Sequence, residues 1–78
     1  MSADERLEEA AKLYEAAAEE LELAARHCRT AAQHFRDRVI PRGAAHAWAA
    51  WGHIRSAEES LNTQARMHAR RSRPEPGD

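Results

Sequence analysis

The chain has 78 residues, a formal net charge of −1 and one cysteine, Cys28, which excludes a disulfide within the chain. A single domain this small buries little apolar surface and usually needs a disulfide, a metal or a second chain for stability. No apolar run approaches the roughly 18 residues of a membrane span, and the N-terminus lacks the basic and apolar regions of a secretory signal. We therefore expect a cytoplasmic protein, not bound to a membrane, that associates with another chain.

The charge is distributed unevenly. Residues 1–25 hold eight acidic against two basic residues, a balance of −6. Residues 26–46 hold five arginines against one aspartate, a balance of +4, and residues 47–73 hold five arginines against two glutamates, a balance of +3. This polarity differs from the uniformly basic surface of a typical nucleic-acid-binding protein.

A first long helix is predicted from residue 3 to about residue 39. Ser2 and Glu5 have the spacing of a capping box, which marks a helix start. A heptad repeat follows, with larger residues at one position and small residues four places later. The larger residues are Leu7, Tyr14, Leu21, Cys28 and Phe35, and the smaller ones are Ala11, Ala18, Ala25, Ala32 and finally Val39. We expect this heptad, Cys28 included, to be buried against a second helix.

Pro41 and Gly43 predict a turn over residues 40–43, because proline has no amide hydrogen to donate and glycine tolerates turn geometry. The second helix is then expected over residues 44–71, with an apolar stripe on one side. The stripe consists of Ala47, Ala50, Ile54, Ala57, Leu61, Ala65 and His68. The tail, residues 72–78, is rich in proline and has no apolar side chain, so we expect it to be disordered.

Two alternatives to a two-helix hairpin remain open. Gly52 weakens the second helix, and a further S-x-x-E spacing follows it, so a break near residues 53–56 would give three helices. Pro41 could instead kink one continuous helix.

The predicted fold is all-α, a long antiparallel two-helix hairpin that forms one domain over residues 1–71. The antiparallel orientation places the basic end of the second helix beside the acidic start of the first. Because two helices leave apolar surface uncovered, we expect a homodimer that forms a four-helix bundle. The candidate partner interface is Trp48, Trp51, Leu13 and Leu23. Of the two tryptophans, Trp51 is expected to cover Phe35 and Val39, and Trp48 to be buried by the second chain.

The histidines raise the question of a metal site. His27 and His34 are seven residues apart, as are His46 and His53. On one helix this spacing separates two side chains by about 10.5 Å along the axis, too far to chelate one ion. We therefore expect surface histidines and assign neither a metal site nor a cofactor, while a metal-binding helical bundle remains an alternative.

The chain has no glycine-rich phosphate loop and no distinct pair of catalytic acids, so we expect it not to be an enzyme. The sequence predicts a small protein–protein interaction module, a dimeric helical scaffold or adaptor with an unidentified protein partner. The other alternative is an accessory nucleic-acid-binding protein that contacts phosphates through arginines near the turn and the C-terminus. These arginines are Arg36, Arg38, Arg42, Arg70, Arg71 and Arg73.

Overall fold

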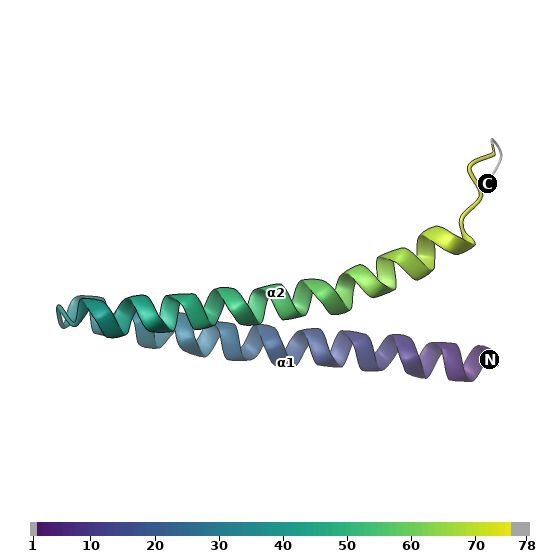
Figure 1. Ribbon diagram of the computed structural model, residues 1–78. Coiled ribbons are helices and arrows are strands. Elements are labelled where there is room, and N and C mark those ends of the chain that lie inside the picture. The colour runs from purple at the N-terminus through teal and green to yellow at the C-terminus, as the bar shows by residue number, and fades with distance from the viewer. Residues whose placement is uncertain (1, 76–78) are drawn as a thin grey trace.

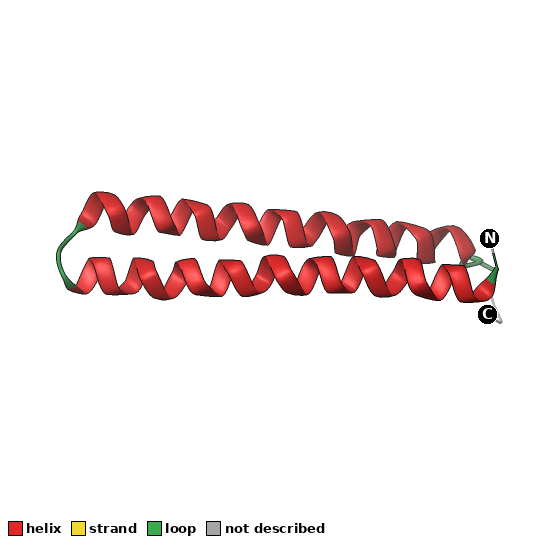
Figure 2. Cartoon of the chain, turned by 90° about the horizontal axis from the view of Figure 1, so that it is seen from below, coloured by secondary structure: helices red, strands yellow, loops and turns green. Residues whose placement is uncertain are grey.

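The computed structural model describes residues 2–75 and contains two helices joined by a short turn. Helix α1 spans Ala3–Arg36 and helix α2 spans Ile40–Arg71. The helices run side by side in opposite directions, as both views show (Figure 1 and Figure 2). The all-helical hairpin is therefore confirmed. Helix α2 continues unbroken through residues 53–56, and the chain reverses before Pro41, so neither alternative topology is present.

Helix α1 begins at the predicted capping box. The Glu5 amide donates to Ser2 Oγ at 3.1 Å, and Glu5 Oε1 accepts from the Ser2 amide at 3.4 Å. These reciprocal bonds satisfy amide groups that have no partner within the helix. The start of α1 is thus determined by local sequence and is confirmed.

The turn lies at residues 37–39, earlier than the predicted residues 40–43. Arg38 adopts a left-handed backbone conformation with φ of 61°. Its amide donates to the Phe35 carbonyl at 3.1 Å, and the Val39 amide donates to the His34 carbonyl at 2.8 Å. These two bonds make a Schellman motif, which ends α1. Pro41 lies in the first turn of α2, where a missing amide hydrogen costs nothing and the φ of proline suits the helix.

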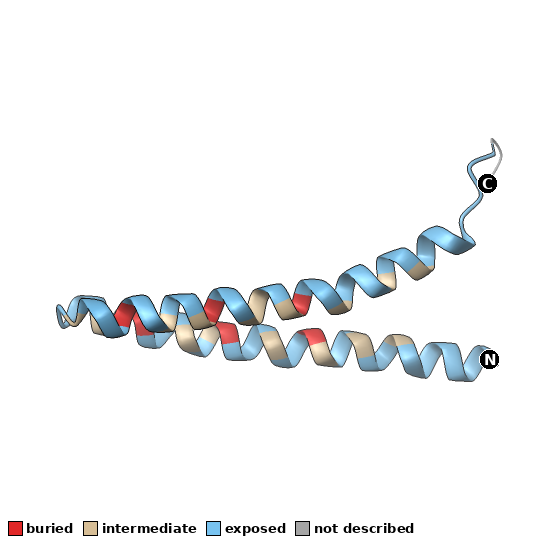
Figure 3. Cartoon of the chain, in the orientation of Figure 1, coloured by how far each residue is buried: buried red, intermediate tan, exposed pale blue. Residues whose placement is uncertain are grey.

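The two helices meet through small side chains. Each helix places a buried small residue at every seventh position, a period that favours left-handed supercoiling. We call this set the alanine seam, and it consists of Ala17, Ala24, Ala31, Gly43, Ala50 and Ala57. Figure 3 shows these residues where the two ribbons face each other. Outside residues 17–57, the described part of the chain has no buried residue, and α2 curves away from α1 towards the open end.

The prediction that the larger heptad residues are buried against α2 is wrong. They lie on the next row around α1, so Leu7 is 69% exposed and Tyr14 is 54% exposed. The stripe predicted for α2 is only partly buried, because Ala50 and Ala57 belong to the alanine seam whereas Leu61 is 41% exposed. The alanine seam and the row of larger residues repeat with the same seven-residue period. The seam faces α2 because its small side chains allow a closer approach of the two helices.

The segment after α2 was predicted to be disordered over residues 72–78. Residues 72–75 continue from α2 without helical structure and are exposed. The remaining three positions of that prediction lie outside the described residues.

Two glycines of α2 have different roles. A methyl group at Gly43 would stand 2.8 Å from Cε1 of Phe35, so the absence of a side chain lets the Phe35 ring cover the start of α2. A methyl group at Gly52 would meet nothing within 4 Å. Gly43 is therefore required for close packing, while Gly52 only weakens the helix.

We expect Gly52→Ala to raise the free energy of unfolding by about 1 kcal/mol, the usual gain in helix propensity. Gly43→Ala should gain less or lose stability, because the added methyl group displaces Phe35. Thermal unfolding followed by circular dichroism compares the two variants at equal protein concentration. Equal gains for both substitutions would contradict the close contact between Gly43 and Phe35.

Enlarging the alanine seam should destabilise the hairpin. Ala57 is 1% exposed, and Ala57→Leu should lower the free energy of unfolding by about 1–3 kcal/mol through overpacking. Ala45 of the same helix is exposed, so Ala45→Leu, the control, should change stability by less than about 0.5 kcal/mol. Urea unfolding measures both, and a tolerated leucine at position 57 would show that the helices do not pack through this row.

Candidate functional site

The alanine seam divides the hairpin into two flanks with different chemistry. In each helix the residues beside the seam also repeat every seven positions, so each flank is built from one row of α1 and one row of α2. In an antiparallel pair, rows displaced in the same rotational sense from the seam lie on the same side of the hairpin. One side is apolar, and the other carries four of the five histidines.

The first flank is the apolar face. Tyr14 and Leu61 line one shallow hollow on it, and Phe35 and Ala47 line another, so side chains of both helices contribute along its length. Trp51 lies at the edge of this face, one row beyond Ile54. We define the face by the apolar members of two rows in which residues recur every seven positions. These are Leu7, Tyr14, Leu21, Cys28 and Phe35 of α1 and Ile40, Ala47, Ile54 and Leu61 of α2.

Trp51 was expected to cover Phe35, but the other tryptophan takes that place. Trp48, not Trp51, lines the hollow with Phe35. Trp48 is nevertheless 75% exposed and Trp51 is 47% exposed, so both leave ring surface uncovered in a single hairpin. Cys28 is also exposed rather than buried, because its row lies beside the alanine seam and not in it.

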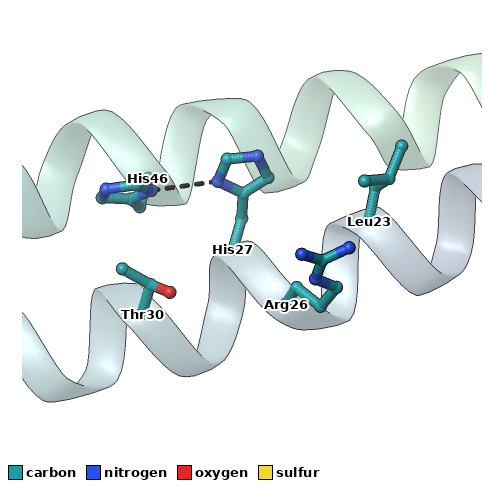
Figure 4. Close-up of a pocket in the computed structure, with 5 residues that line it drawn as sticks. All are labelled: Leu23, Arg26, His27, Thr30 and His46. Carbon is teal, nitrogen blue, oxygen red and sulfur yellow. Dashed lines mark hydrogen bonds between the residues drawn. The ribbon is translucent and has the colours of Figure 1, made fainter.

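The other two residues of the predicted partner interface lie on the opposite side. Leu23 lines a pocket with His27 and His46, as Figure 4 shows. Leu13 is half-buried and lies two heptads before His27, in the same row of α1. The predicted interface residues are therefore divided between the two flanks of the hairpin, with the tryptophans on one and the leucines on the other.

The second flank contains a row of stacked imidazole rings, the histidine ladder. Its members come alternately from α2 and α1. The ring centroids of His53 and His27 are 5.4 Å apart, those of His27 and His46 are 5.2 Å apart, and those of His46 and His34 are 5.4 Å apart. All four rings are partly buried between the helices. The ladder runs along the groove between α1 and α2 on this flank.

Two hydrogen bonds hold the ladder together. One Nδ1–H of the His27 and His46 pair donates to the Nδ1 of the other ring at 3.0 Å (Figure 4). At the end of the row, His53 Nδ1 donates to Glu20 Oε2 at 2.6 Å. The first bond requires a lone pair on one of the two rings, whereas the second bond joins an imidazole N–H to a carboxylate. The ladder therefore has the chemistry of a proton-binding site.

Sequence reasoning missed the ladder although its signal was present. The seven-residue spacing does keep the two histidines of one helix apart. The histidines of the antiparallel helix alternate with them along the groove, so that each ring lies beside a ring of the other helix. His27 follows Ala24 by three positions, and His53 follows Ala50 by three positions, so both rows lie on the same side of the alanine seam. Once the alanines are recognised as the seam, the meeting of the histidines follows.

The ladder rings stack rather than converge on one point. In residues 2–75, no group of three or more His, Cys, Asp or Glu side chains is arranged so that it could hold a metal ion. The chemistry visible in the ladder is hydrogen bonding of imidazole, between two rings and to a carboxylate.

The candidate arginines form two separate clusters. Arg36, Arg38 and Arg42 lie at the turn, whereas Arg70 and Arg71 lie at the opposite end of a hairpin that is 57 Å long. A final member of the predicted set, Arg73, is exposed in the segment after α2. The antiparallel fold therefore does not join these arginines into one continuous basic surface.

No protein-family model matches this chain, and neither a curated protein nor a solved structure matches it. Among residues 2–75, neither helix has the length and apolar character needed to cross a bilayer. Functional inference therefore starts from the two flanks of the hairpin.

Proposed function

We propose that this protein is a non-enzymatic interaction module, a small scaffold or adaptor that acts as a homodimer. Two hairpins join through their apolar faces and form a four-helix bundle. One observation carries the proposal: the hydrophobic residues buried between the helices are all alanines, while most large apolar side chains are exposed along one flank. The single free cysteine of the chain suits the reducing cytoplasm in which we place this dimer.

The exposed area supports a second copy as the partner. The hairpin exposes 6286 Å², whereas a compact monomer of 8.8 kDa exposes about 4,800 Å². The excess, about 1,500 Å², is larger than the roughly 800 Å² that each partner buries in a standard interface. Covering the apolar face of each hairpin with the other would bring the exposed area towards that of an ordinary folded protein.

The rows of α1 favour an antiparallel contact between the two copies of this helix. Beside Leu7, Tyr14 and Leu21 runs a row of small residues, which lets a neighbouring helix approach closely. This row consists of Ala11, Ala18, Ala25 and Ala32. The heptad that predicts a helical partner is thus available to α1 of a second copy rather than to α2 of the same chain.

Charge along the rim of the apolar face supports the same orientation. The row of α1 beyond the alanines is exposed, acidic towards the open end of the hairpin and basic towards the turn. Its members are Glu8, Glu15, Glu22, Arg29 and Arg36. In an antiparallel pair, Glu8 of one copy lies near Arg36 of the other, and Glu15 lies near Arg29. A parallel pair would instead place the two rim rows on opposite sides of the contact, where they cannot pair, so the charges favour the antiparallel orientation.

The two leucines of α1 that lie on opposite flanks test the interface. Leu21→Ser should weaken dimerisation at least tenfold, because burial of a leucine is worth about 1.5–3 kcal/mol and the symmetric dimer buries two. Leu23→Ser, two residues away, should leave the dimer intact. Light scattering over a concentration series measures the association, with circular dichroism to verify helicity. A monomeric parent protein, or equal effects of both substitutions, would contradict the proposed interface.

Charge reversal tests the orientation. Glu8→Arg with Glu15→Arg makes the rim row of α1 almost wholly basic, and Arg29→Glu with Arg36→Glu makes it wholly acidic. Each double variant alone should dimerise more weakly than the parent protein at low salt, and an equimolar mixture should form a mixed dimer. Native mass spectrometry distinguishes the mixed species. The opposite result, two stable homodimers with no preference for mixing, would exclude the antiparallel contact of the α1 helices.

A further inference from the structure

The histidine ladder lies on the flank that the proposed dimer leaves open, and its geometry limits how many protons it can bind. Its order along the groove is His53, His27, His46 and His34, with each ring beside the next. In a row of four rings, at most two can be charged without placing charges on neighbours. A third proton creates adjacent imidazolium rings with centroids 5.2–5.4 Å apart.

The hydrogen bonds reinforce this limit. The bond between His27 Nδ1 and His46 Nδ1 is 3.0 Å long and needs a lone pair on one ring. Protonation of both rings would point two N–H groups at each other. At the other bond of the ladder, His53 Nδ1 donates to the Glu20 carboxylate, so this bond needs no lone pair on the ring. Protonation of both His27 and His46 therefore breaks the hydrogen bond that joins them.

The surrounding charges add to the repulsion. Arg26 lines the pocket beside His27 and His46, and Glu20 accepts the hydrogen bond of His53. The other charged residues in the turn or within one helical turn of a ladder ring along the sequence are Arg29, Arg36, Asp37, Arg38, Arg42 and Arg55. Four charged rings and six arginines against two carboxylates would give this part of the hairpin a net charge of +8.

We infer that the histidine ladder is a pH-sensitive latch between α1 and α2, which holds the hairpin closed at neutral pH and opens it when a third and fourth ring are protonated. Histidine side chains generally gain their proton between about pH 8 and pH 5. Protonation of both His27 and His46 leaves no lone pair for the 3.0 Å bond between their Nδ1 atoms and places two charged rings side by side, whereas the open hairpin has no such contact to lose. We therefore expect stability to fall as the pH falls.

Thermal unfolding at pH 7.5 and pH 5.0, at one protein concentration and with a chelator present, tests the latch. The parent protein should show a lower Tm at pH 5.0. His27→Gln combined with His46→Gln leaves two rings that are not adjacent, so this variant should lose most of the difference in Tm. The control is His68→Gln, which changes a histidine beside Tyr14 and Leu61 on the other flank and should keep the difference.

A second variant addresses the anion at the end of the ladder. Glu20→Gln removes the anion that lies against the end of the protonated ladder, so the acid transition should move to higher pH. Carboxylates generally stay ionised between pH 7.5 and pH 5.0, and histidine titration dominates this interval. An unchanged Tm in the parent protein, an acid sensitivity that persists without His27 and His46, or a transition that Glu20→Gln does not move would each overturn the latch.

The consequence for assembly rests on the proposed function. Both helices build the apolar face, so opening of the hairpin also dismantles the surface proposed for dimerisation. Light scattering on the same samples separates the two ideas. A monomer at both pH values with an intact acid transition would refute the homodimer and leave the latch standing, whereas a dimer without an acid transition would do the reverse.

Discussion

The packing of alanine against alanine between α1 and α2 is the constraint on which the other features depend. The seam residues, such as Ala24 and Ala57, carry only a methyl group, so the two helices approach closely and the flanking rows of both helices meet. Tyr14 thereby comes beside Leu61, and His27 beside His46. The same small residues bury little apolar surface, at about 0.8 kcal/mol for each buried CH₂ group. The contact that shapes the hairpin therefore contributes little to its stability.

Because the seam buries little apolar surface, the two flanks of the hairpin differ in what they expose. The apolar face offers the large side chains that the inside of the hairpin cannot accommodate, and their burial in the proposed dimer would supply the missing hydrophobic stabilisation. The histidine ladder occupies the opposite flank, between the same two helices, and connects their separation to protonation. A scaffold built in this way would have one side for assembly and another that responds to pH.

Much of the helical architecture followed from local signals. The capping box of Ser2 and Glu5 marked the start of α1, because its hydrogen bonds join residues three apart. The absence of proline or glycine before residue 41 indicated a long helix, and opposed charges indicated an antiparallel hairpin. The turn was misplaced because Pro41 is compatible both with a turn and with the first turn of a helix. The actual reversal uses Arg38 in a left-handed conformation, for which arginine gives no sequence signal.

The amino-acid sequence by itself determined the two helices, the heptad period and the partition of apolar and polar residues into rows, because these depend on neighbours within about one helical turn. Only the tertiary structure decided which row faces the other helix. The rows of Ala24 and of Leu21 have the same period, and the choice between them depends on how closely two distant segments approach. That choice exposed the apolar face and brought the four histidines together, so both candidate sites arise from packing between helices rather than from a local motif.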